Sequence, residues 1–433
     1  MTKLGDELFL HLRRFKLDQL LMLIANEIRR MFNENKPMKN IPVIRYHGPI
    51  YEKGKVTVTA WNMSDLAYLA IQKTNDFRGS GPSINNLVEL CNLFLAWDND
   101  RAKLEYEGLI GNETALKLLV GLSQKQFWYQ EFHRFRDEFN RQVELLEVIP
   151  SEIGSQIDLE CACNEVSGFD LRTFRTILLG LFSVAITQSD LSYLISDGSA
   201  AKAHPALTAK NVNQVIDLYR CDYKEFRQSP LLENHFYIKP IVRTSFNRLI
   251  GVNTYMFAKK IADGPFWIIR DYYHSRGSQS FVNVFGEYFE RYVEKLLQHC
   301  LPKKSIDRVP PPQSGRYADW FIYTQHYRLI VELKSSIAGL MMRRNYPDIE
   351  SILNYLEKFK EGVLQLDSTA QAYPDATRTT IKILVHYEIL GLSDGFLRPI
   401  VVDAIKEKLE NTEHVYFCDI NEFEWFISIL GSS

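Results

Sequence analysis

The sequence predicts a mostly α N-terminal region followed by a C-terminal α/β domain in which helices flank a mixed sheet. Two observations carry this prediction. Apolar residues recur at three-to-four spacing through most of the first 275 residues, the period of amphipathic helices. After the Gly- and Ser-containing step at residues 276–280, strand-like runs alternate with helical patterns, as in α/β proteins. We therefore expect a helical recognition or regulatory region at residues 1–275, with a possible subdivision near residue 150, and a second domain at residues 276–433.

The N-terminal elements follow from apolar periodicity and turn residues. Residues 8–32 form one amphipathic stripe, and residues 43–51 and 55–61 suggest a hairpin around a Gly-containing turn. The spacing predicts further helices at residues 63–72, 84–97, 114–122, 124–148, 171–188, 211–226 and 246–261. The helix at residues 171–188 is so apolar that we expect it to be buried on most sides.

The C-terminal elements alternate in type. Residues 281–299 predict a helix, and the three consecutive prolines within residues 308–314 predict a loop. Strands are expected at residues 318–323, 328–335, 380–390 and 414–419, and helices at residues 347–366 and 398–411 and at the C-terminus. Two neighbouring strands followed by alternating helices favour a mixed sheet with helices on both faces.

Composition limits the function classes. The chain has 433 residues, of which 46% are hydrophobic, enough for two or three domains with cores. Its most apolar uncharged run is shorter than the roughly 20 residues of a spanning helix, and the N-terminus lacks a signal-peptide core. We therefore expect a cytoplasmic protein without a membrane partner. The scattered cysteines support neither a zinc ribbon nor a disulfide framework.

Charge is balanced overall, with 51 Lys and Arg against 53 Asp and Glu. Two stretches are locally basic: residues 1–60 hold 11 bases and six acids, and residues 229–280 hold seven bases and three acids. These stretches could bind a polyanion, although ordinary solvent-exposed surfaces have a similar composition. The aromatic residues between positions 236 and 273 resemble a stacking platform for single-stranded nucleic acid, but we favour a helical core.

Three residues in the second half suggest chemistry: Asp319, Glu332 and Lys334. In residues 328–334, Glu332 and Lys334 point to one face of an otherwise apolar strand, because strand side chains alternate. A hairpin would bring Asp319 close to them. Two adjacent carboxylates repel, and a divalent cation relieves the repulsion; oxygen ligands favour Mg²⁺, for which Mn²⁺ is expected to substitute. The alternative to a metal site is that Glu332 and Lys334 form an ion pair at the rim of the sheet and that Asp319 is an ordinary turn residue.

The pattern Asp319…Glu332-Leu-Lys334 resembles the D…ExK signature of the PD-(D/E)XK nuclease superfamily, which has the restriction-endonuclease-like fold. The resemblance implies that Asp319 and Glu332 are metal ligands and that Lys334 is the catalytic base or orients water. The proline of the signature is replaced here by Ala318, which is not a ligand position.

The preceding helix strengthens this resemblance. Its sequence Gly-Glu-Tyr-Phe-Glu, ending at Glu290, is similar to the G-x-x-F-E helix of Mrr-like members, which implies a catalytic role for Glu290. Glu287 competes for that role. Gln365 resembles the polar residue that many members place on the helix after the ExK strand. Arg343 and Arg344 could contact phosphates, or could belong to an exposed loop.

The resemblance implies a Mg²⁺-dependent endonuclease that hydrolyses phosphodiester bonds in nucleic acid, with DNA favoured and RNA, including transfer RNA, as the second choice. The layout resembles bacterial anti-phage defence nucleases, in which an N-terminal sensor restrains the nuclease. A phage-derived activator or a regulatory protein is then the expected partner, and a homodimer is left open.

Two alternatives have other chemistry. Arg270 and His274 on the expected helix at residues 267–275 could resemble the Arg/His pair of HEPN ribonucleases, although their spacing is one residue short. Alternatively, the nuclease-like domain serves only to bind nucleic acid or protein. The presence of every expected catalytic residue argues against the second alternative.

Overall fold

The computed structural model describes residues 3–43, 54–107, 112–130, 135–196, 200–228, 235–311, 315–339, 341–344, 346–388, 394–410 and 413–432. The chain divides into two compact units. Unit 1 comprises Met1–Gly108, Lys125–Val143 and Asp158–Ser278, and unit 2 comprises Leu109–Gln124, Glu144–Ile157 and Gln279–Ser433. The last change of unit falls inside the expected step at residues 276–280, but two earlier segments also belong to unit 2.

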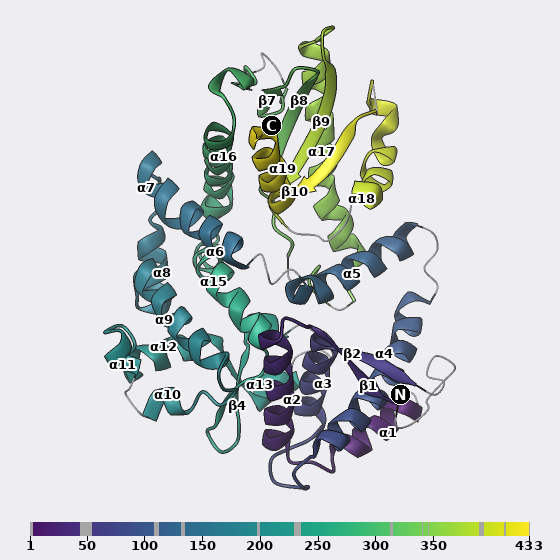
Figure 1. The fold of residues 1–433 in the computed structure, drawn as a ribbon, viewed down its shortest axis with the longest axis vertical. Coiled ribbons are helices and arrows are strands. Elements are labelled where there is room, and N and C mark those ends of the chain that lie inside the picture. The colour runs from purple at the N-terminus through teal and green to yellow at the C-terminus, as the bar shows by residue number, and fades with distance from the viewer. Residues whose placement is uncertain are drawn as a thin grey trace. The chain divides into compact units, whose positions relative to one another are not determined.

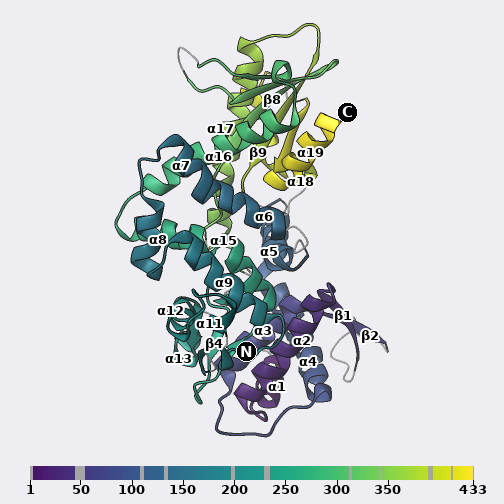
Figure 2. The ribbon, with the colours of Figure 1, turned by 60° about the vertical axis from the view of Figure 1, so that its left-hand side comes forward.

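Unit 1 is mostly helical, as predicted (Figure 1). Its helices are α1 (Lys3–Leu12), α2 (Leu17–Asn33), α3 (Ala60–Lys73), α4 (Ile84–Tyr106), α6 (Phe135–Val143), α8 (Leu159–Ser167), α9 (Leu171–Ala185), α10 (Tyr193–Ser196), α11 (Ala200–Ala203), α12 (Ala209–Tyr219), α13 (Tyr223–Gln228), α14 (His235–Ile238) and α15 (Thr254–Ser275), and the end of α5 (Asn112–Gln130) joins them. Figure 2 shows α15 with α8 and α9 beside it. The largely buried α15 is central to the core of this unit.

The single helix expected at residues 8–32 is two helices, α1 and α2. Between them the backbone is diverted by Ser80, whose N–H donates to the Arg14 carbonyl at 2.9 Å and whose carbonyl accepts from the Lys16 N–H at 3.0 Å. Periodicity alone could not show this break, because both helices bury the same kind of apolar face. The helix α9 also differs from expectation, since Leu179 is 39% exposed and the helix is buried mainly on one side.

A small three-stranded sheet replaces parts of two expected helices in unit 1. It contains β3 (Arg220–Asp222), β4 (Ile241–Arg243) and β5 (Leu249–Gly251), with β4 parallel to β3 and antiparallel to β5. The helix predicted at residues 246–261 therefore begins only at Thr254. The turn before β5 includes Asn247 at a φ of 58°, a left-handed conformation that a helix cannot contain.

The predicted hairpin is present in altered form. β1 (Met38–Pro42) pairs antiparallel with β2 (Lys55–Thr59). Apart from its first residue, the strand expected at residues 43–51 lies outside the described residues. The second strand ends two residues early because the Thr59 hydroxyl accepts the Asn62 N–H at 3.2 Å and so caps α3.

Unit 2 contains a five-stranded mixed sheet flanked by helices, which confirms the predicted class. The strand order is β10-β9-β8-β7-β6, in which β6–β7–β8 are antiparallel and β8–β9–β10 are parallel. The strands are β6 (Ile306–Arg308), β7 (Trp320–Tyr323), β8 (Tyr327–Lys334), β9 (Thr379–His386) and β10 (Val415–Asp419). The helices are α7 (Ile149–Ile153), α16 (Ser280–Cys300), α17 (Ile349–Ala372), α18 (Asp394–Val401) and α19 (Ile420–Ser432), together with the start of α5 and a π-helical turn at Glu144–Val148.

Apart from shifts in the bounds of other elements, two elements of unit 2 differ from the prediction. The edge strand β6 was not expected, because its three residues Ile-Asp-Arg carry no apolar alternation. The helix expected at residues 398–411 begins earlier, as α18, and continues as a 3₁₀ helix at Asp403–Lys408. Neither difference changes the strands that carry the candidate site.

The two faces of β8 belong to different cores, as its alternation predicted. Leu329 and Val331 pack with residues of α16 and α19, whereas Ile330 packs with residues of α17 and α18 (Figure 1). Glu332 and Lys334 share the face of Ile330. Among the described helices of both units, none combines the length and the apolarity needed to cross a membrane.

Candidate metal and nucleic-acid site

Asp319 is held beside the end of β8 by backbone pairing. Its N–H donates to the Val331 carbonyl at 3.0 Å, directly before the register pair of Trp320 with Val331. Its carboxylate oxygen Oδ2 accepts the Leu333 N–H at 2.8 Å. The antiparallel hairpin therefore brings Asp319 next to Glu332 and Lys334, as the sequence predicted.

Glu332 and Lys334 lie under α17. The Lys334 Nζ donates to Glu332 Oε1 and to Gln365 Oε1, each at 2.6 Å. The approach of α17 requires Gly362, because a Cβ there would lie 2.8 Å from Lys334 Cε and 3.3 Å from Glu332 Cγ. Gln365 thus fixes the lysine from the helix, and Gly362 leaves space for both side chains.

The two carboxyl groups are not fully compensated. Glu332 Oε2 is buried and has no hydrogen-bond partner among the described residues. Burial and the charge of Asp319 raise the pKa of Glu332 to about 8, although Lys334 opposes the shift. Burial, opposed by the bond from Leu333, raises the pKa of Asp319 to about 6, with a further contribution from the charge of Glu290. A direct bond between Asp319 and Glu332 would need a proton on one of them.

Glu290 comes from α16 and reaches the same region. Its charge acts on Asp319, whereas Glu287 is exposed on the helix, so Glu290 is the carboxylate of this helix that faces the site. Glu290 accepts a bond from Arg308 of β6, which also lies 3.5 Å from Glu294 and 4.7 Å from the centre of the Trp320 ring. The sequence prediction missed Arg308, because β6 gave no strand signal.

The donor set fits a hard cation with water ligands. Within the described ranges, no three or more His, Cys, Asp or Glu side chains form a group that could by itself hold a metal ion. Asp319 and Glu332 nevertheless supply adjacent carboxylates, and one oxygen of Glu332 is buried without a donor. A cation such as Mg²⁺, which binds few protein carboxylates and keeps water, matches this arrangement.

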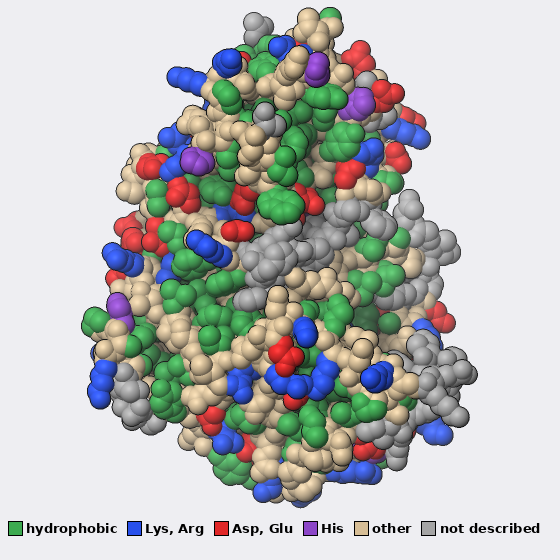
Figure 3. Space-filling model, viewed as in Figure 1, with side chains coloured by type: hydrophobic (Ala, Val, Ile, Leu, Met, Phe, Trp, Pro, Cys, Tyr) green, Lys and Arg blue, Asp and Glu red, His purple; other side chains and the backbone are tan. Residues whose placement is uncertain are grey.

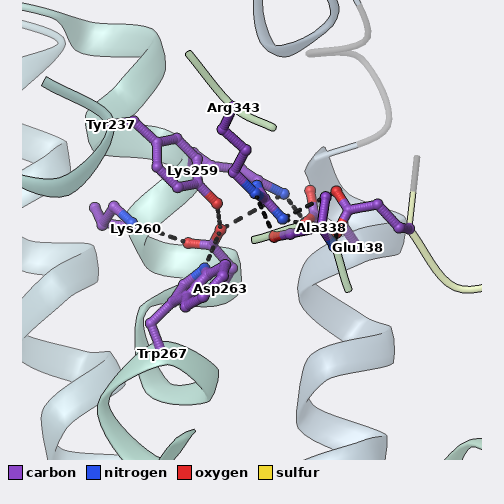
Figure 4. A network of polar contacts seen from close by, with 9 residues as sticks. Glu138, Tyr237, Lys259, Lys260, Asp263, Trp267, Ala338 and Arg343 are labelled. Atoms are coloured by element: carbon purple, nitrogen blue, oxygen red, sulfur yellow. Dashed lines mark hydrogen bonds and ion pairs between the residues drawn. The ribbon is translucent and has the colours of Figure 1, made fainter. Parts of the chain in front are cut away.

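Arg343 is buried and ion-paired inside unit 2, and its side chain is largely shielded from solvent. It is 6% exposed, and its Nη2 donates to both carboxylate oxygens of Glu388, at 2.9 and 2.7 Å. Its Nε donates to the Ala338 carbonyl at 3.1 Å (Figure 4). This pair ties the segment after β8 to the end of β9, and Arg343 is therefore left out of the site. Arg344, the next residue, is partly exposed.

The basic and aromatic residues of α15 form a buried network in unit 1 (Figure 4). Asp263 accepts from the Tyr237 hydroxyl at 2.7 Å and from Trp267 Nε1 at 3.0 Å, and lies 3.5 Å from Lys260 Nζ. Lys259 is paired with Glu138. These charges compensate one another, which favours the core interpretation of this stretch.

The second candidate of unit 1 lies at the end of α15. Arg270 stacks at 5.0 Å from the Trp267 ring centre and lies 3.5 Å from Asp271, and His274 is exposed one turn later. The two residues therefore share one side of the helix. Each is available to solvent at least in part, so a HEPN-like role remains a testable alternative.

Comparisons with known proteins were made for the whole chain. No family model, curated protein or solved structure matches it. The site at the β7–β8 hairpin is therefore interpreted from its own geometry and chemistry.

Proposed function

We propose that unit 2 is a Mg²⁺-dependent nuclease of the PD-(D/E)XK type, with a restriction-endonuclease-like fold, that hydrolyses phosphodiester bonds in nucleic acid. The observation that carries the proposal is the convergence of Asp319, Glu332 and Lys334 at one end of an antiparallel hairpin. Glu290 on the preceding helix supports it. The order α16-β6-β7-β8-α17-β9 agrees with the family core, with β6 as an added edge strand.

In this proposal Asp319 and Glu332 hold the cation. When bound, a divalent cation of this kind lowers the pKa of a bound water and neutralises charge on a phosphoryl oxygen. The raised pKa values mean that both carboxyl groups favour the protonated form, so ionising them together requires positive charge beyond that of Lys334, which a bound cation would supply. Glu290 adds a third negative charge, and Arg308 compensates it.

Lys334 is the proposed residue for the attacking water. Its Nζ is fixed by Glu332 Oε1 and Gln365 Oε1 and has one further proton to donate. That third N–H can orient the water for in-line attack. Gln365 acts as a positioning residue, since it holds the lysine in place from α17.

The substrate is proposed as DNA first and RNA second. Acidic and basic side chains are interspersed over the face drawn in Figure 3, so on this face phosphates would be bound by local groups of side chains and not by one broad basic surface. We further propose that unit 1 acts as the sensor of an anti-phage defence nuclease, released by a phage-derived activator or a regulatory protein. This last step rests on the layout of the chain alone.

Purified protein incubated with duplex DNA, single-stranded DNA and total RNA tests the proposal. We expect cleavage of at least one substrate with Mg²⁺ or Mn²⁺ and none in EDTA. Asp319→Ala should abolish the activity together with its cation dependence. The matched control Asp307→Ala removes an exposed acid from the neighbouring strand β6 and should cleave normally. Undiminished turnover in EDTA would refute the metal site.

The HEPN-like alternative predicts the opposite pattern of loss. Because His274 is exposed and shares a helix face with Arg270, His274→Ala would remove that chemistry without disturbing unit 2. Cleavage that survives Lys334→Ala and disappears with His274→Ala would assign the activity to unit 1. Cleavage lost only with Lys334→Ala supports the site on β8.

A further inference from the structure

Two phenylalanines of unit 1 are displayed to solvent side by side. Phe77 is 71% exposed and Phe246 is 61% exposed, and their ring centroids lie 5.9 Å apart at an interplanar angle of 68°. They come from turns far apart in the sequence, one after α3 and one between β4 and β5. We call Phe77 and Phe246 the aromatic pair. Because exposed aromatic rings gain nothing from burial, the way in which this pair is supported is informative.

A buried aspartate fixes the two turns to each other. Asp76 is 1% exposed and accepts the Asp18 N–H and the Tyr223 hydroxyl at Oδ1 and the Ser245 N–H at Oδ2, each at 2.9 Å. Asp76 directly precedes Phe77, and Ser245 directly precedes Phe246. A buried carboxylate is costly unless donors satisfy it. The chain therefore maintains a buried hydrogen-bonded hub whose outward neighbours are both rings.

Local hydrogen bonds make each turn rigid. Asn75 Oδ1 accepts the N–H groups of Phe77 and Arg78, at 3.0 and 3.1 Å. Thr244 Oγ1 accepts the N–H groups of Phe246 and Arg248, at 3.3 and 3.1 Å. Both rings are thus presented by ordered backbone, and a ligand that stacks on them would not have to order the turns first.

Two arginines lie on backbone next to the aromatic pair: Arg78 directly follows Phe77, and the Arg14 carbonyl accepts the N–H of Ser80 in the same turn. Arg14 and Arg78 are exposed, and neither has an ion-pair partner in the described part of the chain. Their loops touch closely: Gly79 has a φ of 101°, and a Cβ there would lie 2.5 Å from the Arg14 carbonyl oxygen. Lys16 is partly exposed beside them.

The acids near this surface are already engaged. Asp190 and Asp18 lie 2.8 and 3.8 Å from Arg248, and Asp76 is the buried hub. Of the charged residues named here, Arg14 and Arg78 are the exposed ones without an ion-pair partner in the described part of the chain, and both are basic. Of the two basic stretches of the sequence, residues 1–60 contribute Arg14 to this surface, whereas Arg248, from residues 229–280, is paired with Asp190 and Asp18.

We propose that the aromatic pair, with Arg14 and Arg78, binds an unpaired segment of nucleic acid. A base would stack on the rings while backbone phosphates meet the two guanidinium groups. Stacked bases require a single strand, so this surface would recognise single-stranded DNA or RNA in preference to a duplex. The choice of nucleic acid as the ligand rests on the proposed function of unit 2, and the surface would supply its substrate recognition.

Binding of labelled single-stranded DNA and RNA oligonucleotides and matching duplexes to the full chain, measured in EDTA, tests the proposal without cleavage. Phe77→Ala combined with Phe246→Ala should weaken single-strand binding by about 10- to 100-fold, the usual effect of removing stacking. Arg14→Ala with Arg78→Ala should lower the slope of log affinity against log salt by about 1.4, or about 0.7 for each phosphate contact. Leu10→Ala, which removes another side chain that is 61% exposed in unit 1, is the control and should bind as wild type.

Three outcomes would overturn the proposal: wild-type protein that does not bind single strands, that binds duplexes as tightly as single strands, or a double-Phe variant that binds like Leu10→Ala. If that variant instead abolishes self-association in sedimentation and binds nucleic acid normally, the aromatic pair is a protein contact. The nuclease proposal is tested separately, by Mg²⁺-dependent cleavage assays, and it fails if Asp319→Ala cleaves as wild type does. Selective single-strand binding by a chain that cleaves nothing would support the surface and reject the nuclease.

Discussion

Two buried carboxylate–lysine pairs lie between α17 and the same face of the sheet in unit 2. One joins Glu332 and Lys334, and the other joins Asp367 and Lys382. Both carboxylates are 3% exposed, and both lysines project from strands toward the helix. The pairs are alike in burial and in chemical type, so differences between them show what each is for.

The pairs differ in how completely the carboxylate is satisfied. Asp367 accepts from Lys382 Nζ at 2.5 Å, from Gln371 Nε2 at 2.8 Å and from the Glu410 N–H at 2.9 Å. Glu332 accepts only from Lys334, and its Oε2 has no partner among the residues that the structure describes.

The two pairs also differ because a second carboxyl group, that of Asp319, lies next to Glu332. Asp319 repels Glu332 and helps to raise its pKa to about 8. A saturated pair stabilises a fold, whereas an under-paired one weakens it and is typical of a functional site. The comparison therefore separates a structural pair from a pair available for catalysis, and the variants below test that separation.

The largest expected difference is in cleavage. Lys334→Ala should lower the rate constant by about 10²–10⁴, the usual effect of removing a positioned proton-transfer group. Lys382→Met, the matched change in the saturated pair, should leave the rate constant of the folded fraction unchanged. Single-turnover rates normalised to folded protein by circular dichroism provide the measurement. Equal losses in the two variants would remove the distinction between the pairs.

For stability, the larger effect is expected from the saturated pair and the smaller from the pair of Glu332 and Lys334. Asp367→Ala leaves Lys382 buried without its carboxylate and should reduce the free energy of unfolding by about 3–5 kcal/mol. Glu332→Gln removes an under-paired buried charge while keeping its shape, and should change that free energy by less than about 1 kcal/mol. Urea denaturation in the absence of divalent cations measures both. A Glu332→Gln variant as unstable as Asp367→Ala would show that Glu332 is structural.

The raised pKa values give a pH dependence of known sign. The folded protein retains a proton on Asp319 up to about pH 6 and on Glu332 up to about pH 8, whereas the unfolded chain releases both near pH 4. Stability from these groups is therefore present at the acidic end and lost as pH rises through the folded-state pKa values of about 6 and about 8. The loss should amount to several kcal/mol in all, because each pKa unit of difference corresponds to about 1.4 kcal/mol. Glu332→Gln should flatten this slope in pH-dependent denaturation, and a slope that the variant leaves unchanged would contradict its assignment to Glu332.

Mg²⁺ should oppose the loss of stability that is expected as pH rises. A cation binds the ionised carboxylates, so its stabilising effect should grow as pH rises through the pKa values of Asp319 and Glu332. The thermal unfolding midpoint with and without Mg²⁺, measured across this range, is the readout. An increment that does not change with pH would contradict binding at these two groups.

The sequence predicted how Asp319, Glu332 and Lys334 are placed relative to one another, but not the residues that surround them. Strand alternation in residues 328–334 placed Glu332 and Lys334 on one face, and the short hairpin placed Asp319, because both depend on local patterns. Arg308 was missed because a three-residue edge strand has no periodicity. Arg343 was taken for a surface cation because its partner Glu388 is distant in sequence.

Breaks in regular structure were also missed where they depend on contacts between residues distant in sequence. The interruption between α1 and α2 and the β4–β5 turn depend on hydrogen bonds to Ser80 and to Asp76, which no local pattern encodes. The exposed aromatic pair belongs to the same class. Phe246 read as part of a helical core, and only the long-range position of Asp76 reveals that it faces solvent.

The smallest predicted effect concerns the helix above the under-paired carboxylate. A Cβ at Gly362 would lie 2.5 Å from Leu384 Cδ1 and 2.8 Å from Lys334 Cε, so Gly362→Ala must displace side chains of the site. Overpacking should outweigh the gain of about 1 kcal/mol in helix propensity and give a net destabilisation of about 1 kcal/mol.

Gly286 in α16 is the matched control, because its nearest neighbour would be Ser335 Oγ at an ordinary 3.4 Å. Gly286→Ala should stabilise the chain by about 0.5–1 kcal/mol, since only helix propensity acts there. If Gly362→Ala stabilised the protein equally, α17 would not be packed tightly on Glu332 and Lys334. The fixed position of the lysine, on which the comparison with Asp367 and Lys382 depends, would then need another cause.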